Sequence, residues 1–139
     1  MPAPFVTSRR VEFRDTDAAG IMHFASILCT MEAAEHEFLR HIKLPLFKPV
    51  EGGKISWPRV SSHCDFRSPA RFEDVIDVAV SVQRLGKKSV TYFFSITCDE
   101  RLVAEGTMTA ACCFVGKDGI SSIEVPKDIV AKLSAYLIP

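Results

Sequence analysis

The stretch DTDAAGIMHF, from Asp15 to Phe24, decides how the rest of the chain is interpreted, because two carboxylates and a glycine lead directly into a long amphipathic segment. Apolar side chains then recur in steps of three and four residues over about five helical turns, at Phe24, Ile27, Leu28, Met31, Ala34, Phe38 and Ile42. This period predicts one long helix that begins between Met22 and Ser26, with Ser26 as a candidate cap, and that ends before Pro45. The helix is expected to bury its apolar stripe against another layer.

The polar positions of this helix predict a solvated face, to which we assign Glu32 and Glu35. Asp17 falls on the loop at the helix entrance, where free backbone N–H groups and the positive end of the helix dipole also point. A carboxylate in this place is either a site residue or a solvated loop or cap residue. Asp15 is a candidate to turn the loop by bonding to its backbone.

The remaining sequence predicts strands, because its apolar residues alternate between turn residues. We expect strands at Phe5–Arg14, Arg59–Phe66, Asp74–Leu85, Ser89–Cys98 and Leu102–Val115. The segment Leu44–Pro58 is rich in proline and contains Gly52-Gly53, which indicates a long loop with at most a short helical turn. Pro126 and the apolar residues after it predict a short C-terminal helix. One helix packed on a largely antiparallel sheet is an α+β fold, and residues 1–139 are expected to form a single domain.

Charge and cysteine content exclude several classes of function. The chain has 17 basic and 17 acidic side chains, a balance that disfavours nucleic acid and anionic membranes as partners. It shows no signal-peptide pattern and no apolar run approaching about 18 residues, so we expect a cytoplasmic protein without a membrane span. Its 5 cysteines have no Cys-x-x-Cys spacing, which predicts neither a disulfide framework nor a metal site.

A sheet with free edge strands favours a homodimer or homotetramer.

The element order, together with EFRDTDAAGI at Glu12–Ile21, resembles the hot-dog-fold acyl-CoA thioesterases, specifically the 4-hydroxybenzoyl-CoA thioesterase family and its tol-pal-associated relatives. The most specific part is the Asp-x-Asp-x-x-Gly-[Ile/Val] run that enters the helix. Weaker matches occur at Ser68–Asp74, Lys87–Ser89 and Ile123–Pro126, so the resemblance spans nearly the whole chain. It implies a hot-dog fold, in which a five-stranded, mostly antiparallel sheet wraps around one long central helix and a short helix follows at the C-terminus.

The same resemblance implies an acyl-CoA thioesterase that hydrolyses a coenzyme A thioester to the free acid and coenzyme A. Asp17 would be the catalytic carboxylate, acting as nucleophile on the thioester carbonyl or as general base on water. Gly20 would allow the tight turn toward the helix. The backbone N–H near Phe24 would polarise the thioester oxygen. No cofactor is implied, because coenzyme A is part of the substrate.

Substrate binding is implied at a second place, the turn Lys87-Lys88 with Ser89, where relatives hold the nucleotide phosphates of coenzyme A. The pantetheine arm would then thread between two subunits to reach Asp17. His23 is assigned to the substrate pocket as well, where it would line the acyl group or orient water, although a histidine packed beside the helix fits the sequence equally well.

Several alternatives stay open at this point. His63 is either an ordinary sheet residue or a residue bordering the pocket. The pair His23-Phe24 stands where aromatic-rich relatives have Trp-Tyr and the tol-pal group has Tyr-His, so the acyl group is not determined. Two other functions fit the fold: a non-catalytic acyl-CoA-binding module, and an acyl-thioester dehydratase or hydratase, whose His-Phe-Pro pattern His23-Phe24-Ala25 lacks.

Overall fold

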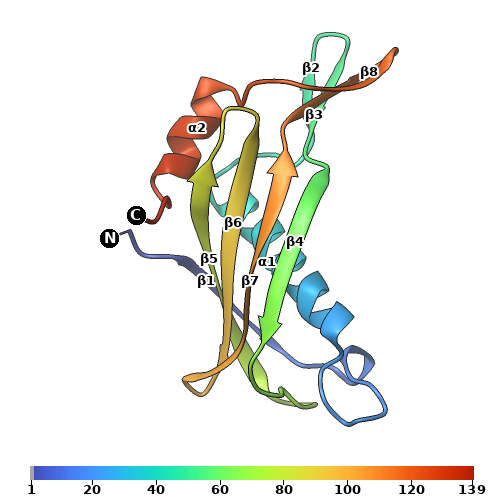
Figure 1. The fold of residues 1–139 in the computed structure, drawn as a ribbon, viewed down its shortest axis with the longest axis vertical. Coiled ribbons are helices and arrows are strands. Elements are labelled where there is room, and N and C mark those ends of the chain that lie inside the picture. The colour runs from blue at the N-terminus through green and yellow to red at the C-terminus, as the bar shows by residue number, and fades with distance from the viewer. Residues whose placement is uncertain (1) are drawn as a thin grey trace.

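A computed structural model describes residues 2–139, and its largest feature is an antiparallel sheet of five strands packed on one long helix (Figure 1). The strands run in the spatial order β1 (Phe5–Arg10), β5 (Val75–Leu85), β6 (Ser89–Cys98), β7 (Arg101–Ala111) and β4 (Arg59–Phe66). Helix α1 (Phe24–His41) lies behind the sheet, and α2 (Lys127–Ser134) lies beside β5. The predicted α+β arrangement of a central helix, a five-stranded sheet and a short C-terminal helix is confirmed.

The core lies between α1 and the sheet. In β6 every second side chain is buried, from Val90 to Cys98, because alternate residues of a strand point to opposite faces. From α1, the buried side chains include Met31 and Phe38 of the predicted stripe, and Phe38 packs edge-on against Tyr92 of β6 at 6.3 Å between ring centroids. Burying each side chain of this size, relative to leaving it in water, contributes about 1.5–3 kcal/mol to the free energy of folding. The stripe therefore fixes the helix on the sheet.

Helix α1 begins inside the predicted interval, but its cap is His23 and not Ser26. His23 has extended backbone angles, and its Nδ1 accepts a hydrogen bond from the N–H of Ala25 at 3.2 Å. Ser26 is unable to cap the helix because it already lies within the first turn. The segment before the helix also differs from the prediction, since β1 ends at Arg10 and Phe13–Asp15 form a short 3-10 helix, η1.

A second, smaller sheet was not predicted. The expected loop contains a hairpin of β2 (Lys48–Val50) and β3 (Gly53–Ser56), and β3 pairs with β8 (Cys113–Gly116), which continues into β9 (Gly119–Ser122). These four strands form an arm that extends beyond the five-stranded sheet at the top of Figure 1.

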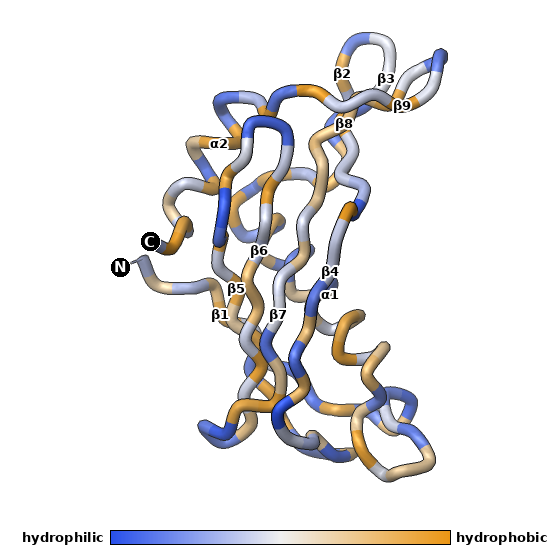
Figure 2. Tube along the Cα trace, in the orientation of Figure 1, coloured by the Kyte–Doolittle hydropathy of each residue, from blue (hydrophilic) through white to orange (hydrophobic). Residues whose placement is uncertain are grey.

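The expected long strand Leu102–Val115 is therefore wrong in one respect, because it is interrupted at Cys112. The N–H of Cys112 donates to the carbonyl of Lys88 at 2.8 Å, which continues the register of the β6–β7 ladder by one pair. Beyond Cys112 the chain leaves the main sheet, and β8 pairs with β3 and β9. Figure 2 shows that the nearby β5–β6 turn is strongly hydrophilic. Among the helices of residues 2–139, none is long and apolar enough to cross a membrane.

Candidate active site

The loop between β1 and α1 is held by the two ends of Asp15. Its carboxylate accepts a hydrogen bond from the N–H of Glu12 at 2.9 Å, and its carbonyl accepts one from the N–H of His23 at 2.8 Å. The first bond closes η1, and the second joins η1 to the cap of α1. Asp15 thus turns the loop by bonding to the loop's backbone, as predicted.

Asp17 lies in a tight turn at the exposed tip of this loop. Its Oδ1 accepts a hydrogen bond from the N–H of Ala19 at 2.8 Å, and its carbonyl accepts one from the N–H of Gly20 at 2.9 Å. Gly20 has φ +79°, a left-handed conformation that glycine adopts without the penalty of a Cβ atom. One oxygen of the Asp17 carboxylate is therefore held by the turn.

The start of α1 supplies a hydrogen-bond donor near this carboxylate. Among the backbone hydrogen bonds of residues 2–139, none is donated by the N–H of Phe24, the first residue of the helix. An unsatisfied N–H at the positive end of a helix dipole favours negative charge. Phe24 can therefore donate to an oxygen on which charge develops.

A cleft of about 460 Å³ brings Asp17 and Phe24 together. It is lined by Asp17, Ile21, Met22, Phe24, Ile27, Phe66, Ser68, Pro69 and Ala70. The rings of Phe24 and Phe66 meet edge to face at 6.4 Å, and these residues are 58% and 49% exposed. The cleft is thus an apolar site with a carboxylate and a free amide beside it. Phe66 and the Ser68–Ala70 wall were not predicted as site residues, although the sequence match at Ser68–Asp74 was a signal for the wall.

Glu35 on α1 is buried, which contradicts its assignment to the solvated face, whereas Glu32 is exposed as expected. The exposed fraction of Glu35 is 3%, and both of its carboxylate oxygens accept hydrogen bonds from Arg59 at 2.8 Å. The Glu35 carboxylate raises the pKa of the Arg59 guanidinium, against the opposing effect of burial. The prediction failed because it considered the helix alone, and Arg59 comes from β4. Both carboxylate oxygens of Glu35 are therefore engaged by Arg59.

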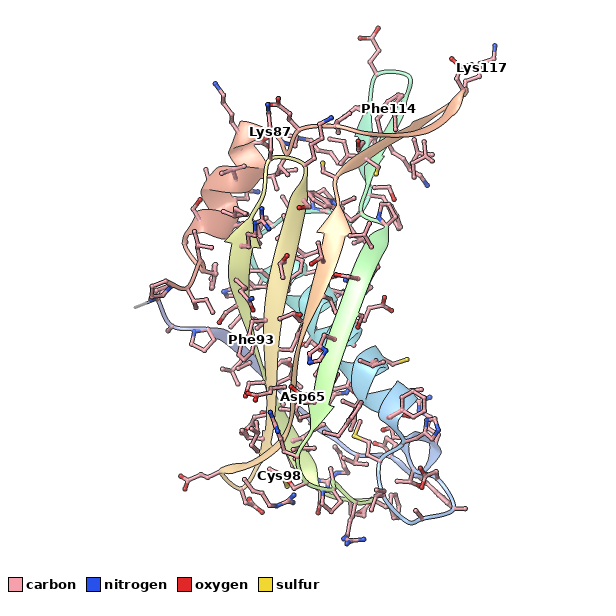
Figure 3. All side chains as sticks on the ribbon, viewed as in Figure 1. Asp65, Lys87, Phe93, Cys98, Phe114 and Lys117 are labelled. Atoms are coloured by element: carbon pink, nitrogen blue, oxygen red, sulfur yellow. The ribbon has the colours of Figure 1, made fainter. Side chains whose placement is uncertain are left out.

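The predicted phosphate-binding residues Lys87, Lys88 and Ser89 lie at the β5–β6 turn. Lys87 pairs with Glu124 at 3.3 Å on the surface. Below it, the carbonyls of Lys87 and Lys88 accept hydrogen bonds from the N–H groups of Val125 and Cys112. Figure 3 shows Lys87 at the end of the sheet opposite to the loop that precedes α1. One chain therefore does not bring this turn and Asp17 together.

The two candidate histidines lie outside the residues that line the cleft. His23 caps α1, and its ring packs against Phe24 at 4.7 Å between centroids. His63 is exposed on β4, where its Nε2 lies 3.3 Å from a carboxylate oxygen of Asp65. Across residues 2–139, no three His, Cys, Asp or Glu side chains are grouped so that they could hold a metal ion.

Comparisons with known proteins identify the family of this chain. Residues 11–133 match the family model of the thioesterase-like superfamily. A 1,4-dihydroxy-2-naphthoyl-CoA hydrolase from Synechococcus sp. (strain CC9605) is 33% identical over 106 residues, which cover 73% of this chain and 71% of that protein. The 4-hydroxybenzoyl-CoA thioesterase from Pseudomonas sp. (strain CBS-3) is 26% identical, with 94% of this chain and 97% of that protein covered.

A crystal structure of a hypothetical protein from Thermus thermophilus superposes with a TM-score of 0.83 at 28% identity, covering 94% of this chain and 98% of that chain. The predicted hot-dog fold and the predicted class of enzyme, a thioester hydrolase, are therefore confirmed at the level of the family. The cleft joins a loop carboxylate to a helix N-terminus. Because residues 11–133 match the family model, the chain belongs to the thioesterase-like superfamily.

Proposed function

We propose that the protein is an acyl-CoA thioesterase in which Asp17 attacks the thioester or activates water. The observation that carries this proposal is that Asp17 and Phe24, with its free N–H, line the same cleft. The proposed chemistry needs no partner base, because the Asp17 carboxylate itself attacks the carbonyl or accepts the proton of water. Thioester hydrolysis also needs little help for its leaving group, because a thiolate departs readily.

The proposed reaction begins with attack on the thioester carbonyl. An oxygen of the Asp17 carboxylate, or of a water that gives its proton to Asp17, forms a bond to the carbonyl carbon, and the C=O electron pair moves onto the oxygen. The N–H of Phe24 donates to that oxygen. The C=O bond then re-forms as the C–S bond breaks, and the electron pair leaves with the coenzyme A thiolate, which takes up the proton from Asp17 if water was the nucleophile. If Asp17 was the nucleophile, water then hydrolyses the resulting anhydride to the free acid and regenerates the Asp17 carboxylate. The mechanism uses no cofactor.

For the acyl group, we propose an aromatic ring. The two named relatives act on a naphthoyl and a benzoyl thioester according to their names. In this chain the half-exposed rings of Phe24 and Phe66 stand in the cleft, where a flat apolar group would remove them from water. Rings also favour edge-to-face and offset contacts, which discriminate a flat acyl group from a linear one.

We propose further that the working enzyme is a homodimer or homotetramer. Strand β4 is an edge strand, and its free backbone groups favour antiparallel pairing with a second copy. Such a two-fold pairing sets the Lys87 end of one sheet beside the Asp17 end of the other. Lys87, Lys88 and Ser89 would then bind the phosphates of a coenzyme A whose thioester reaches Asp17 of the other subunit. His23 in substrate binding, a cytoplasmic location and the absence of nucleic-acid partners stay predictions.

The test is the release of free coenzyme A from aromatic, short-chain and long-chain acyl-CoA thioesters by the wild type, Asp17→Asn and the control Asp118→Asn. Asp118 lies on the exposed β8–β9 turn, so its variant is expected to keep wild-type rates. Asp17→Asn is expected to abolish turnover and retain acyl-CoA binding, because the amide has nearly the same shape but neither attacks nor accepts a proton. Wild-type rates in Asp17→Asn would refute the mechanism. Binding of acyl-CoA by the wild type without hydrolysis would favour a binding module instead.

A further inference from the structure

Arg101, the first residue of β7, is exposed, yet its guanidinium reaches the segment that follows β4. Its Nη1 donates to Oγ of Ser68 at 2.7 Å and to the carbonyl of Pro69 at 2.6 Å. The Ser68 hydroxyl in turn donates to the carbonyl of Leu102 at 2.6 Å. One cationic side chain therefore fixes two consecutive residues of the segment.

The fixed segment is the wall of the candidate active site. Ser68, Pro69 and Ala70 line the cleft that also contains Asp17. Ala70 is buried, and its carbonyl accepts a hydrogen bond from the N–H of Met22 at 2.7 Å. Met22 precedes the cap of α1 by one residue. The contacts of Arg101 thus connect, through the Pro69-Ala70 peptide and Met22, to the start of the helix.

The segment has few other anchors. Pro69 has no N–H, and the N–H groups of Arg67 and Ser68 share a single acceptor, the carbonyl of Val103, at 2.8 and 3.2 Å. A charge-assisted bond from a planar guanidinium is stronger and more directional than the bond of a water molecule in the same place. Without Arg101, the polar contacts that the wall retains are those of the Ser68 N–H, the Ser68 hydroxyl and the Ala70 carbonyl.

We propose that Arg101 is a positioning residue for thioester hydrolysis. It holds the Ser68–Ala70 wall so that Met22, and with it the N–H of Phe24, stays in register with Asp17. This role rests on the proposed function of the same cleft. Arg101 acts through the wall and the loop, since it is not among the residues that line the cleft.

The experiment compares the wild type with Arg101→Ala, Arg101→Lys and Arg67→Ala, using an aromatic acyl-CoA that the wild type hydrolyses. Arg67 is a matched control because it is an exposed arginine of the same region whose side chain binds Asp65 and Glu105 and not the wall. Arg101→Ala is expected to lower kcat about ten- to a hundredfold, since small misplacements of reacting groups have such effects. KM is expected to change little, and Arg101→Lys is expected to restore part of kcat.

A second readout does not depend on activity. Amide hydrogen exchange, followed by NMR, is expected to be faster at Met22 in Arg101→Ala and unchanged there in Arg67→Ala. An unchanged kcat, an unchanged exchange rate at Met22, or an equal loss in both alanine variants would overturn the proposal. If the wild type hydrolyses no thioester, the proposed function fails, and the exchange rate at Met22 alone then decides whether Arg101 holds the loop.

Discussion

Glu35 of α1 and Arg59 of β4 face each other through two hydrogen bonds of 2.8 Å, Nη1 to Oε1 and Nη2 to Oε2. This pair joins the central helix to the edge strand of the sheet, and the carboxylate is nearly inaccessible to solvent. A buried carboxylate that loses its partner is strongly destabilising. We therefore expect Arg59→Ala to lower the free energy of unfolding by about 3 kcal/mol or more.

Urea denaturation of Arg59→Ala and of the control Arg67→Ala checks this expectation. Arg67 makes only surface ion pairs, so its removal is expected to cost less than about 1 kcal/mol. The double variant Glu35→Leu/Arg59→Met removes both charges and is expected to recover much of the loss. Equal midpoints for the two arginine variants would show that the Glu35–Arg59 pair carries no special energy.

Gly20 offers a test of loop geometry. A Cβ atom built at this residue meets nothing within 4 Å, so Gly20→Ala introduces backbone strain at φ +79° without a clash. We expect a cost of about 1–2 kcal/mol in stability and a fall in kcat of about tenfold or more, because the turn carries Asp17. Gly119 on the arm is the control, since it also has a positive φ and open space around its Cβ position. If Gly119→Ala lowers kcat as much, the effect of Gly20→Ala comes from stability alone.

The lysine turn gives a prediction about substrate affinity. If Lys87 and Lys88 bind the phosphates of coenzyme A, Lys87→Ala/Lys88→Ala raises KM about tenfold at low salt, with kcat nearly unchanged. The difference from the wild type shrinks as ionic strength increases. Lys117 lies on the turn of the arm in Figure 3, and the control Lys117→Ala is expected to leave KM unchanged. A salt-independent KM in the double variant and in the wild type alike would remove this turn from the binding site.

The cysteines give a prediction about pH. Burial, with a smaller effect of Cys113, raises the pKa of Cys112 from 9.0 to about 11. Between pH 9 and 11, the Cys112 thiol therefore keeps its proton in the folded state and loses it in the unfolded state. The thiol contributes stability that is fully present below pH 9 and is lost as the pH rises from 9 toward 11. The fall in unfolding free energy over that range is expected to be shallower in Cys112→Ala. At pH 8, a thiol reagent is expected to modify the exposed Cys29 before buried Cys112, and the reverse order would contradict this assignment.

Periodicity was sufficient to predict the central helix and the main sheet. The three- and four-residue steps from Ile27 to Phe38 and the alternation in β6 each report burial on one face, and both elements pack as predicted. The Asp17 turn was predictable for a related reason, because a glycine between a carboxylate and a helix indicates a tight turn with a positive φ. Local signals such as these need no knowledge of distant residues.

The failures concern residues whose partners are distant in the sequence. Glu35 is buried only because Arg59 satisfies it, and Arg101 matters to the cleft only because its side chain reaches Ser68 and Pro69. The arm was missed because prolines and glycines in Leu44–Pro58 indicate a loop, whereas β3 gains its ladder from β8. The roles of Asp17, Phe24 and the lysine turn in catalysis and binding stay predictions.

The two main-chain bonds beneath the β5–β6 turn have a thermodynamic consequence. Because the carbonyls of Lys87 and Lys88 are held by Val125 and Cys112, the backbone of this exposed turn is already ordered before any ligand arrives. An anion that binds there would restrict only two lysine side chains, and the backbone entropy of about 1–2 kcal/mol per residue would have been lost during folding. Preorganisation of this kind lets an exposed and strongly hydrated pair of charges bind with less opposing entropy than a mobile loop of the same sequence.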